Sequence, residues 1–485
     1  MIPKIIHQIW IGPKPAPTNL MNSWKNKHPD FEYILWNEEE LYRRKFNSSC
    51  MEQLNAIPEI NGKADIIRWE ILYEYGGYFV DADSICIEPF DEYFAKSVAF
   101  ATYENENVRT GLIATGTMGF IPKHPLCRDI IQWIKSSESL KLIKETRAWY
   151  SVGPGLLTKM LETGNYPDFS VFPSHCFLPI HFTGPKYEGH KKVYGYQEWG
   201  TAKQSYDTMN SVVLPAELLP PANSQWVSVL ITSYNTHPFY VKECLDSIKC
   251  QNGYFGIEIV WINDGSTLEN SRTLENELEN FQKNSRFTRV IYHKNDENKG
   301  TAISSNIGLG LCTCDLIFKM DSDDIMLPER MKTQIAFMKN NPKAVICGTN
   351  IKLFQNNSPE TLGKKLFVNE TKHPNIITWK DLYDNKFSWY MNNPTLCYRK
   401  VAIDQVGNYR TDDARILYLH EDYDLLARIL KRYQIVYNLP DVLLLYRLHP
   451  KQLTYKLDSN SPENIALRHN IIEKAAKIET IYVNF

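Results

Sequence analysis

Apolar runs and amphipathic stretches alternate along the first half of the chain. Strand-like apolar patterns occupy Lys4–Ile11 and Phe31–Trp36. Apolar side chains at positions 66, 67, 69, 71 and 72 predict a helix over Lys63–Tyr75, and Gly76-Gly77 would end it. The apolar run Tyr78–Val80 that follows predicts a short buried strand.

In the second half, predicted strands alternate regularly with predicted helices. The strands are Val227–Ile231, Ile257–Ile262, Arg289–His293 and Asp315–Met320, and the helices are Pro238–Lys249, Leu268–Lys283 and Gly300–Leu311. Such alternation indicates a mostly parallel sheet with helices on both faces. Ligands of these sheets bind beyond the carboxyl ends of the strands. The fold class expected for both halves is therefore α/β.

A stretch without periodicity, 207–226, separates the two halves and contains Pro215 and Pro220-Pro221-Ala222-Asn223-Ser224. A chain of 485 residues is also too long for one ordinary core. We expect a first domain over 1–210, a linker over 211–225, a second domain over 226–455 and a C-terminal helical extension over 456–485. The amphipathic stretch Glu463–Ile481 would pack on the second domain, or alternatively bind a partner.

Composition narrows the class of protein. The chain is 43% hydrophobic with a net charge of −2, so no general attraction to nucleic acid or anionic membranes follows. Its ten cysteines show no paired zinc-finger spacing, which favours reduced thiols. No signal-peptide pattern and no apolar run of about 18 residues is found. We expect a soluble cytoplasmic protein without a nucleic-acid partner; a homo-oligomer is left open.

Two aspartate pairs stand at the ends of predicted strands. Asp81-Ala82-Asp83 follows Tyr78–Val80, and Asp321-Ser322-Asp323-Asp324 follows Asp315–Met320. Carboxylates this close repel one another unless a cation lies between them. A divalent ion held by one or two carboxylates, with further ligands from phosphate and water, is the usual arrangement. The repetition predicts two metal-dependent active sites.

Other polar motifs follow the strands of the second half. They are Thr232-Ser233-Tyr234-Asn235, Asn263-Asp264-Gly265-Ser266, Asn298-Lys299-Gly300 and, about a hundred residues after the aspartates, His420-Glu421-Asp422. In this order and spacing, residues 226–455 resemble the inverting glycosyltransferases of family 2, which have the GT-A fold.

This resemblance implies a role for each motif. Ser233, Tyr234 and Asn235 would line the nucleotide pocket, Asp264 would accept a hydrogen bond from the base, and Lys299 would lie near the nucleotide. Asp321 and Asp323 would hold Mn²⁺ or Mg²⁺ on the diphosphate, with Arg447 of Tyr446-Arg447-Leu448-His449 near the phosphate. Asn393-Pro394-Thr395 would lie near the acceptor.

The resemblance also implies that Asp422 is the general base, with Glu421 as the alternative. A carboxylate that takes the proton of an acceptor hydroxyl typically accelerates such a step by about 10²–10⁴-fold. The competing interpretation is that both residues are ordinary first-turn carboxylates of the helix that follows.

In the first half, Ile2–Trp10, Lys63–Trp69 and Gly76–Asp83 resemble the family 32 glycosyltransferases, which have a GT-A-like sheet and are generally retaining. The resemblance covers residues 1–205. It implies that Asp65 contacts the ribose or sugar and Arg68 the donor, and that Asp81 and Asp83 serve the sugar and the metal–diphosphate.

Alternatives remain open in this half. Asp65 and Arg68, three apart on a helix, could form a simple ion pair. Trp10 could stack on a base or belong to the core. Family members often carry a histidine near the end of the site, whereas the corresponding stretch here is Tyr196–Thr201, unless His190 substitutes.

Together these features predict a bifunctional, metal-dependent glycosyltransferase of two tandem GT-A-like domains, the first retaining and the second inverting. Each would bind one Mn²⁺ or Mg²⁺ and a nucleotide sugar, expected to be UDP-linked. The acceptor would be a glycan, glycolipid or glycoprotein, as in polysaccharide biosynthesis. The alternatives are a first domain that only binds nucleotide sugar or glycan, and a nucleotide-sugar hydrolase.

Overall fold

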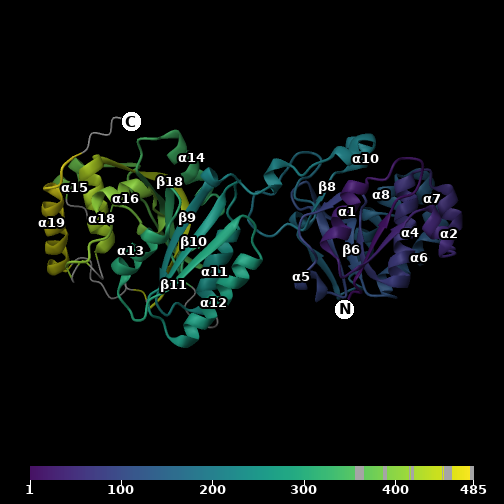
Figure 1. The fold of residues 1–485 in the computed structure, drawn as a ribbon, viewed down its shortest axis with the longest axis horizontal. Helices are drawn as coiled ribbons and strands as arrows, with labels where there is room; N and C mark the ends of the chain where they lie inside the picture. The colour runs from purple at the N-terminus through teal and green to yellow at the C-terminus, as the bar shows by residue number, and fades with distance from the viewer. Residues whose placement is uncertain are drawn as a thin grey trace. The chain divides into compact units, whose positions relative to one another are not determined.

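The structure is a computed structural model that describes residues 1–355, 365–385, 390–413, 416, 420–450, 452 and 461–480. Contacts within the chain divide it into two compact units (Figure 1). The first comprises Met1–Tyr187 and Lys192–Leu218, and the second comprises Glu188–Lys191 and Leu219–Phe485. Residues 456–460 and 481–485 of the expected C-terminal extension lie outside the described residues.

The first unit contains a mixed six-stranded sheet in the order β2-β1-β3-β6-β5-β7, and β4 pairs with β8 in a separate ribbon. Strands β1, β2 and β3 are parallel, and β6 runs antiparallel to β3 and β5. The strands are β1 (Ile5–Ile9), β2 (Glu32–Trp36), β3 (Gly77–Val80), β4 (Ser84–Cys86), β5 (Ala99–Asn105), β6 (Arg109–Phe120), β7 (Phe169–Phe172) and β8 (Gly195–Gln197).

Helices cover this sheet because its two faces are apolar. The helices are α1 (Thr18–Lys27), α2 (Glu38–Arg43), α3 (Met51–Ala56), α4 (Ile60–Tyr75), α5 (Glu92–Ala95), α6 (Pro125–Ile134), α7 (Ser137–Glu145), α8 (Ala148–Ser151), α9 (Pro154–Glu162) and α10 (Gly200–Lys203). Trp69 of α4 packs with Phe79 in one core, whereas Tyr78 and Val80 belong to a second core with Trp24 of α1. Successive β3 side chains thus serve opposite faces.

In the second unit the described strands form one sheet in the order β11-β10-β9-β12-β17-β14-β18-β13, with β15 on β14 and β16 on β18. Strands β9 to β12 are parallel, and β17 runs antiparallel to β12 and β14. The strands are β9 (Trp226–Ser233), β10 (Gly256–Asn263), β11 (Thr288–Lys294), β12 (Leu316–Asp321), β13 (Ile325–Met326), β14 (Ile346–Gln355), β15 (Leu366–Thr371), β16 (Ile376–Thr378), β17 (Cys397–Arg399) and β18 (Ile435–Leu448).

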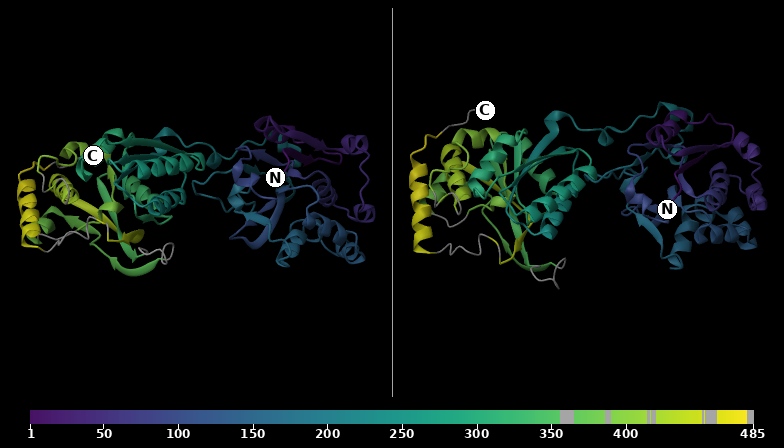
Figure 2. Two further views of the ribbon diagram at one scale, coloured as in Figure 1. Left: turned by 90° about the horizontal axis from the view of Figure 1, so that it is seen from below. Right: turned by 60° about the horizontal axis from the view of Figure 1, so that its bottom comes forward.

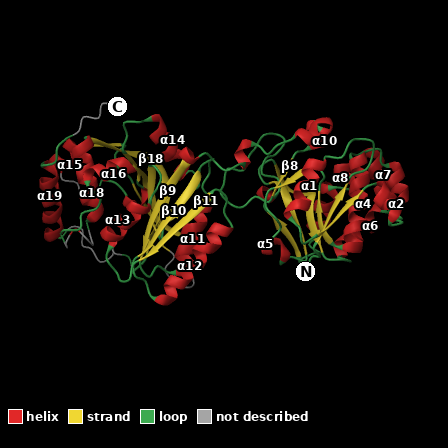
Figure 3. Ribbon diagram, viewed as in Figure 1, coloured by secondary structure: helices red, strands yellow, loops and turns green. Residues whose placement is uncertain are grey.

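Helices flank both faces of this sheet, as Figure 3 shows for α13 on one side of β9–β11 and α11 with α12 on the other. Leu230 of β9 packs in one core with Leu309 of α13, and Val229 packs in another with Leu245 of α11. The helices described are α11 (Pro238–Lys249), α12 (Leu268–Lys283), α13 (Thr301–Leu311), α14 (Arg330–Asn340), α15 (Trp379–Asn385), α16 (Lys400–Val406), α18 (Glu421–Tyr433) and α19 (Pro462–Ala476).

The predicted α/β class is confirmed in both units, each of which combines parallel strands with flanking helices. Helix α19 buries Ile471, Ile472 and Ala475 and contacts α18 at the edge of the second unit (Figure 2). No described helix has the length and apolar character that a membrane crossing requires.

Candidate active sites

In the second unit, the chain leaves β12 at Asp321, beside the end of the parallel strand β9. Lys319, two residues earlier on the same face of the strand, places its ammonium nitrogen 3.6 Å from Asp321 Oδ1. Burial raises the pKa of the Asp321 carboxyl, and the charge of Lys319 partly opposes the shift. The Asp321 side chain keeps 36% of its surface exposed, so the strand end holds a carboxylate that lies beside an ammonium group and can still be reached by a ligand.

The next two acidic residues contact the end of strand β18. His449 Nε2 lies 2.8 Å from Asp323 Oδ2. The fully buried Asp324 accepts a hydrogen bond of 2.9 Å from the backbone N–H of Arg447, and burial raises its pKa well above the usual range. Asp323 and Asp324 thus have different environments, one beside an imidazole and the other inside the protein.

Arg447 supports this loop from within the protein. Its Nε donates to the backbone carbonyl of Asp323 at 2.6 Å, and its Nη2 donates to Glu243 at 2.7 Å. The guanidinium lies 4.1 Å from the ring centre of Tyr240 and 4.7 Å from that of Phe354. With no exposed surface, Arg447 positions the Asp323 backbone.

The loop after β10 is organised by Asp264. Its carboxylate accepts hydrogen bonds from Asn295 Nδ2 at 2.8 Å, from the Lys299 N–H at 2.8 Å and from the Gly300 N–H at 3.0 Å. A carboxylate has about four acceptor positions, so roughly one is left for a ligand. Asp264 therefore fixes the turn into α13, and the half-buried Lys299 lies directly beside it.

The three residues expected at the nucleotide pocket differ in exposure. Ser233 Oγ accepts a hydrogen bond from Trp261 Nε1 at 2.8 Å inside the protein, whereas Tyr234 is 54% exposed. Asn235 has a positive φ of 51°, and its side-chain oxygen accepts from the Thr267 N–H and from Asn270. Ser233 and Asn235 thus shape the loop that presents Tyr234.

Glu421 and Asp422 begin α18, and Asp422 Oδ1 accepts a hydrogen bond of 2.7 Å from the Tyr423 N–H. Burial raises the pKa of Asp422 to about 6, and the charge of Asp321 adds to the shift. Burial and the charge of Asp422 raise the pKa of Glu421 to about 8. Both carboxyls at the start of α18 therefore have a raised pKa, and burial is the largest cause for each.

In the first unit, helix α4 and strand β3 bring three charged side chains together. Arg68 Nη2 donates to Asp81 Oδ1 at 2.9 Å, and Arg68 Nη1 lies 3.1 Å from Asp65 Oδ1. The guanidinium also lies 4.1 Å from the ring centre of Phe79. The expected i,i+3 ion pair exists, and it extends to the first residue of the aspartate pair. Burial raises the pKa of Asp65 to about 6 despite its arginine partner.

Gln197 joins the two aspartates. Its Nε2 donates to Asp83 Oδ1 at 2.6 Å and to Asp81 Oδ2 at 3.3 Å, and the Gly200 N–H donates to Asp83 Oδ2 at 2.8 Å. Burial and the charge of Asp81 raise the pKa of Asp83 to about 7. The sequence indicated that Tyr196–Thr201 borders the site, but the residue expected there was a histidine. The contact of Gln197 with both aspartates was not predicted.

His190 does not substitute for that histidine. It belongs to the second unit, where its Nδ1 lies 2.9 Å from the Gln251 carbonyl and its Nε2 lies 2.8 Å from the Phe255 carbonyl.

Trp10 lies at the end of β1 outside the apolar cores. Its Nε1 donates to the Lys14 carbonyl at 2.8 Å, and its ring centre lies 5.8 Å from that of Tyr206. Burial raises the pKa of Tyr206 to about 12, and the nearby charge of Asp83 adds to the shift. Trp10 and Tyr206 thus form an aromatic pair beside the aspartates.

The donor sets of both sites suit a hard divalent cation. Each offers two carboxylates, and at least one in each site has a pKa raised by burial, which a nearby cation would reverse. No group of three or more acidic, histidine or cysteine side chains among the described residues is already arranged as a metal-binding set. Phosphate and water would have to complete the coordination.

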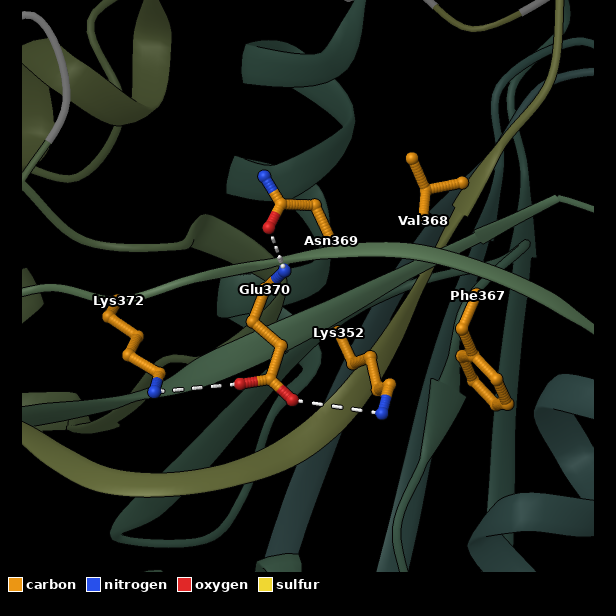
Figure 4. Close-up of a pocket in the computed structure, with 6 residues that line it drawn as sticks. All are labelled: Lys352, Phe367, Val368, Asn369, Glu370 and Lys372. Atoms are coloured by element: carbon orange, nitrogen blue, oxygen red, sulfur yellow. Dashed lines mark hydrogen bonds and ion pairs between the residues drawn. The ribbon is translucent and has the colours of Figure 1, made fainter.

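A separate pocket of about 390 Å³ lies between β14 and β15 of the second unit (Figure 4). Glu370 lies there between Lys352 at 3.7 Å and Lys372 at 3.6 Å. None of the predicted site residues lines it.

Comparisons with known proteins assign the chain to a family. Residues 228–397 match the model described as "Glycosyl transferase family 2", and residues 17–100 match "Glycosyltransferase sugar-binding region containing DXD motif". The chain is 30% identical over 221 residues to the amylovoran biosynthesis glycosyltransferase AmsE of Erwinia amylovora, covering 45% of this chain and 75% of AmsE. The chain belongs to the glycosyltransferases.

Other relatives of this glycosyltransferase resemble part of it. Inositol phosphoceramide mannosyltransferase 2 of Schizosaccharomyces pombe is 30% identical over 165 residues, which are 32% of this chain and 44% of that protein. Among solved structures, S. aureus TarS 1–349 in complex with UDP-GlcNAc has a TM-score of 0.38 and 19% identity, covering 52% of this chain and 68% of TarS 1–349. The mannosyltransferase PcManGT of Pyrobaculum calidifontis, in complex with GDP-Man and Mn²⁺, has a TM-score of 0.35 and 14% identity, covering 52% and 72%.

Proposed function

We propose that this glycosyltransferase has two metal-dependent active sites, one in each unit, and that both use nucleotide-sugar donors. The observation that carries the proposal is the repeated placement of an Asp-x-Asp pair at the end of a parallel strand, with at least one carboxylate pKa raised by burial. A surface aspartate pair would be solvated and would show no such shift.

In the second site, Asp321 and Asp323 would hold Mn²⁺ or Mg²⁺, and His449 Nε2, 2.8 Å from Asp323 Oδ2, would orient the Asp323 carboxylate. A bound divalent ion neutralises charge that develops on the diphosphate leaving group. Arg447 would act by holding the Asp323 backbone in place.

Asp422 would take the proton of the acceptor hydroxyl, and direct displacement would invert the anomeric carbon. Its raised pKa of about 6 suits a base that works near neutral pH. The nucleotide would lie against Tyr234 and Lys299, on loops shaped by Ser233, Asn235 and Asp264.

In the first site, Asp81 and Asp83 would hold the second divalent ion and the diphosphate. Arg68 and Asp65 would bind the donor, and Trp10 would face the nucleoside. Arg68 spans Asp65 and Asp81, so one side chain fixes both carboxylates. We propose retention of configuration here and name no nucleophile.

We further propose domains over 1–210 and 226–455, joined by 211–225 and followed by the extension 456–485. Donors would be UDP-linked, and the acceptor a growing glycan or glycoconjugate in polysaccharide biosynthesis. A cytoplasmic location is supported by the ten cysteines, none of which forms a disulfide among the described residues.

The test uses the full chain with Asp83→Ala, Asp323→Ala and the double substitution, assayed with Mn²⁺, a panel of UDP-sugars and oligosaccharide acceptors. Each single variant should lose one of two transfer products, and the double variant should lose both. Asp441→Ala, at an exposed aspartate, is the matched control. Unchanged products with Asp83→Ala would leave the first unit as a binding scaffold. Donor loss that no acceptor accelerates would favour a hydrolase.

A further inference from the structure

A series of contacts begins at Asp65 of the first site and runs through Trp149 and Arg109. Gly153 packs against it so closely that an added Cβ would lie 2.8 Å from Asp65 Oδ2 and 3.2 Å from the Cα of Trp149. The ring of Trp149, on α8, lies 5.5 Å from the guanidinium of Arg109, at the start of β6. Arg109 thus lies next to the loop that borders Asp65.

The same series continues to Asp83. The guanidinium of Arg109 lies 5.7 Å from the Phe182 ring, which lies 5.2 Å from that of Trp199. Trp199 directly precedes Gly200, whose N–H donates to Asp83 at 2.8 Å.

The carboxylates are also linked through Arg68 and Gln197, from Asp65 through Asp81 to Asp83. Two series of contacts, one carboxylate-rich and one aromatic, therefore share both ends. The aromatic series reaches the two carboxylates through the backbone of Gly153 and Gly200. We call its four side chains, Trp149, Arg109, Phe182 and Trp199, the acceptor ring.

The charge of this ring is balanced. Arg109 Nη1 lies 3.2 Å from Glu104 Oε1, and the buried His181 places its Nε2 3.3 Å from the same oxygen. A guanidinium already neutralised by a carboxylate attracts an additional anion weakly, because a bound phosphate or uronate would have to compete with Glu104.

Two side chains of the acceptor ring, Trp149 and Arg109, are exposed enough for a ligand to reach them. Trp149 is 42% exposed, although a ring of this size usually contributes to a core. The Arg109 side chain is also 42% exposed. Trp199 adopts a left-handed backbone with a φ of 64°, which is costly for a tryptophan and typical of functional sites.

We propose that Trp149 and Arg109, whose guanidinium is held by Glu104, bind a neutral hexopyranose unit of the acceptor, which deepens the proposed function of the first site and rests on it. The face of Trp149 would cover the apolar face of the sugar, Arg109 would donate to its hydroxyls, and the buried Glu104 would keep the guanidinium in place. The nucleoside is assigned to the Trp10–Tyr206 pair, which borders Asp83 through Tyr206 and leaves Trp149 free for the acceptor.

The test measures binding of methyl glucoside, methyl galactoside and methyl mannoside to the full chain by saturation-transfer NMR, in the presence of UDP and Mn²⁺. An Asp323→Ala background removes the metal-dependent contribution of the second site. Trp149→Ala should raise the Kd of the bound glycoside about tenfold, the value expected when one aromatic contact is lost. Arg109→Ala should have a similar effect, and Trp149→Phe should restore part of the affinity.

Tyr42→Ala is the matched control, because Tyr42 is an 87% exposed aromatic residue of the same unit and should leave binding unchanged. Circular dichroism verifies that each variant is folded. The proposal is overturned if no glycoside binds the parent protein, if Trp149→Ala binds as the parent does, or if uridine binding rather than glycoside binding is lost. UDP binding that survives Asp83→Ala would instead contradict the proposed function, and the glycoside result would still decide the acceptor ring.

Discussion

At the scale of single residues, both sites keep carboxylates in places that oppose their charge. Asp65, Asp83, Glu421 and Asp422 all have a raised pKa, and burial is the largest cause each time. Ionised carboxylates in such places cost free energy unless they are paired with cations or used in chemistry. Acids with a raised pKa therefore occur in both candidate sites, on helices α4 and α18 and just after β3.

The pH dependence of the second site should follow Asp422. A base has to be deprotonated, so a pKa raised from 3.8 to about 6 moves the acidic limb of kcat/KM to about pH 6. Asp422→Asn should lower kcat by about 10²–10⁴-fold and leave donor affinity nearly unchanged. Glu421→Gln is the comparison variant, because Glu421 is the adjacent carboxylate in the first turn of α18 and the alternative base. If Glu421→Gln lost the activity and Asp422→Asn kept it, Glu421 would be the base.

The sequence indicated the acids but not their neighbours. Asp81, Asp83, Asp321 and Asp323 stood out because each pair ends an apolar run. Gln197 and His449 could not be found in this way, since each reaches its aspartate from more than a hundred positions away in the chain. Only the pairing of β8 with β4, and the return of β18 beside β13, bring them there.

At the scale of elements, the junction of α4 and β3 sets the geometry of the first site. The helix ends at Tyr75, Gly76 and Gly77 have positive φ values of 64° and 91°, and Asp81 follows only four residues later. A Cβ on Gly77 would lie 2.7 Å from the Ile5 carbonyl oxygen of β1. The tight turn therefore lets β3 pair with β1 directly after the helix.

Gly77→Ala should destabilise this junction. The left-handed backbone alone costs about 1–2 kcal/mol with a side chain, and the clash with β1 adds to it. Gly111→Ala is a matched control, since Gly111 also has a positive φ, of 81°, but has open space around it. Hydrogen exchange in β1 and β3 should rise more for Gly77→Ala, together with loss of the first activity. Equal effects of the two substitutions would show that only the backbone strain matters.

The sequence predicted local elements better than pairings between distant ones. The strands β9 to β12 were expected close to their observed bounds because each is a local apolar run, followed by a helix after β9, β10 and β11 and by the aspartate loop after β12. The pairing of β14 with β18, which is parallel and spans about ninety residues, leaves no local pattern to read. This long-range parallel pairing therefore could not be predicted from the sequence.

At the scale of the whole molecule, the chain passes between the units more than once. Glu188–Lys191 belongs to the second unit, although the flanking residues belong to the first. The His190 ring is buried there between the carbonyls of Gln251 and Phe255. The backbone N–H of His190 donates to the Lys249 carbonyl at 3.0 Å. A short segment of the first half is thus part of the core of the second.

His190→Ala should therefore weaken the second unit. Loss of the ring leaves one buried carbonyl without its donor, at a cost of about 1–3 kcal/mol, because a neutral imidazole carries a single ring N–H. Hydrogen exchange should rise in β10 and stay unchanged in β1, which serves as an internal reference. His293→Ala, at a half-exposed position on β11, is the control. Identical exchange for the two variants would contradict a structural role for His190.

The path of the chain has a consequence for separating the two halves. A protease nick after Leu218 would break the backbone, yet the amino-terminal fragment would still carry Glu188–Lys191, seated among residues of the other fragment. The two fragments would therefore stay associated through the non-covalent contacts of Glu188–Lys191. Separating the two units would therefore need cleavage on both sides of Glu188–Lys191 as well.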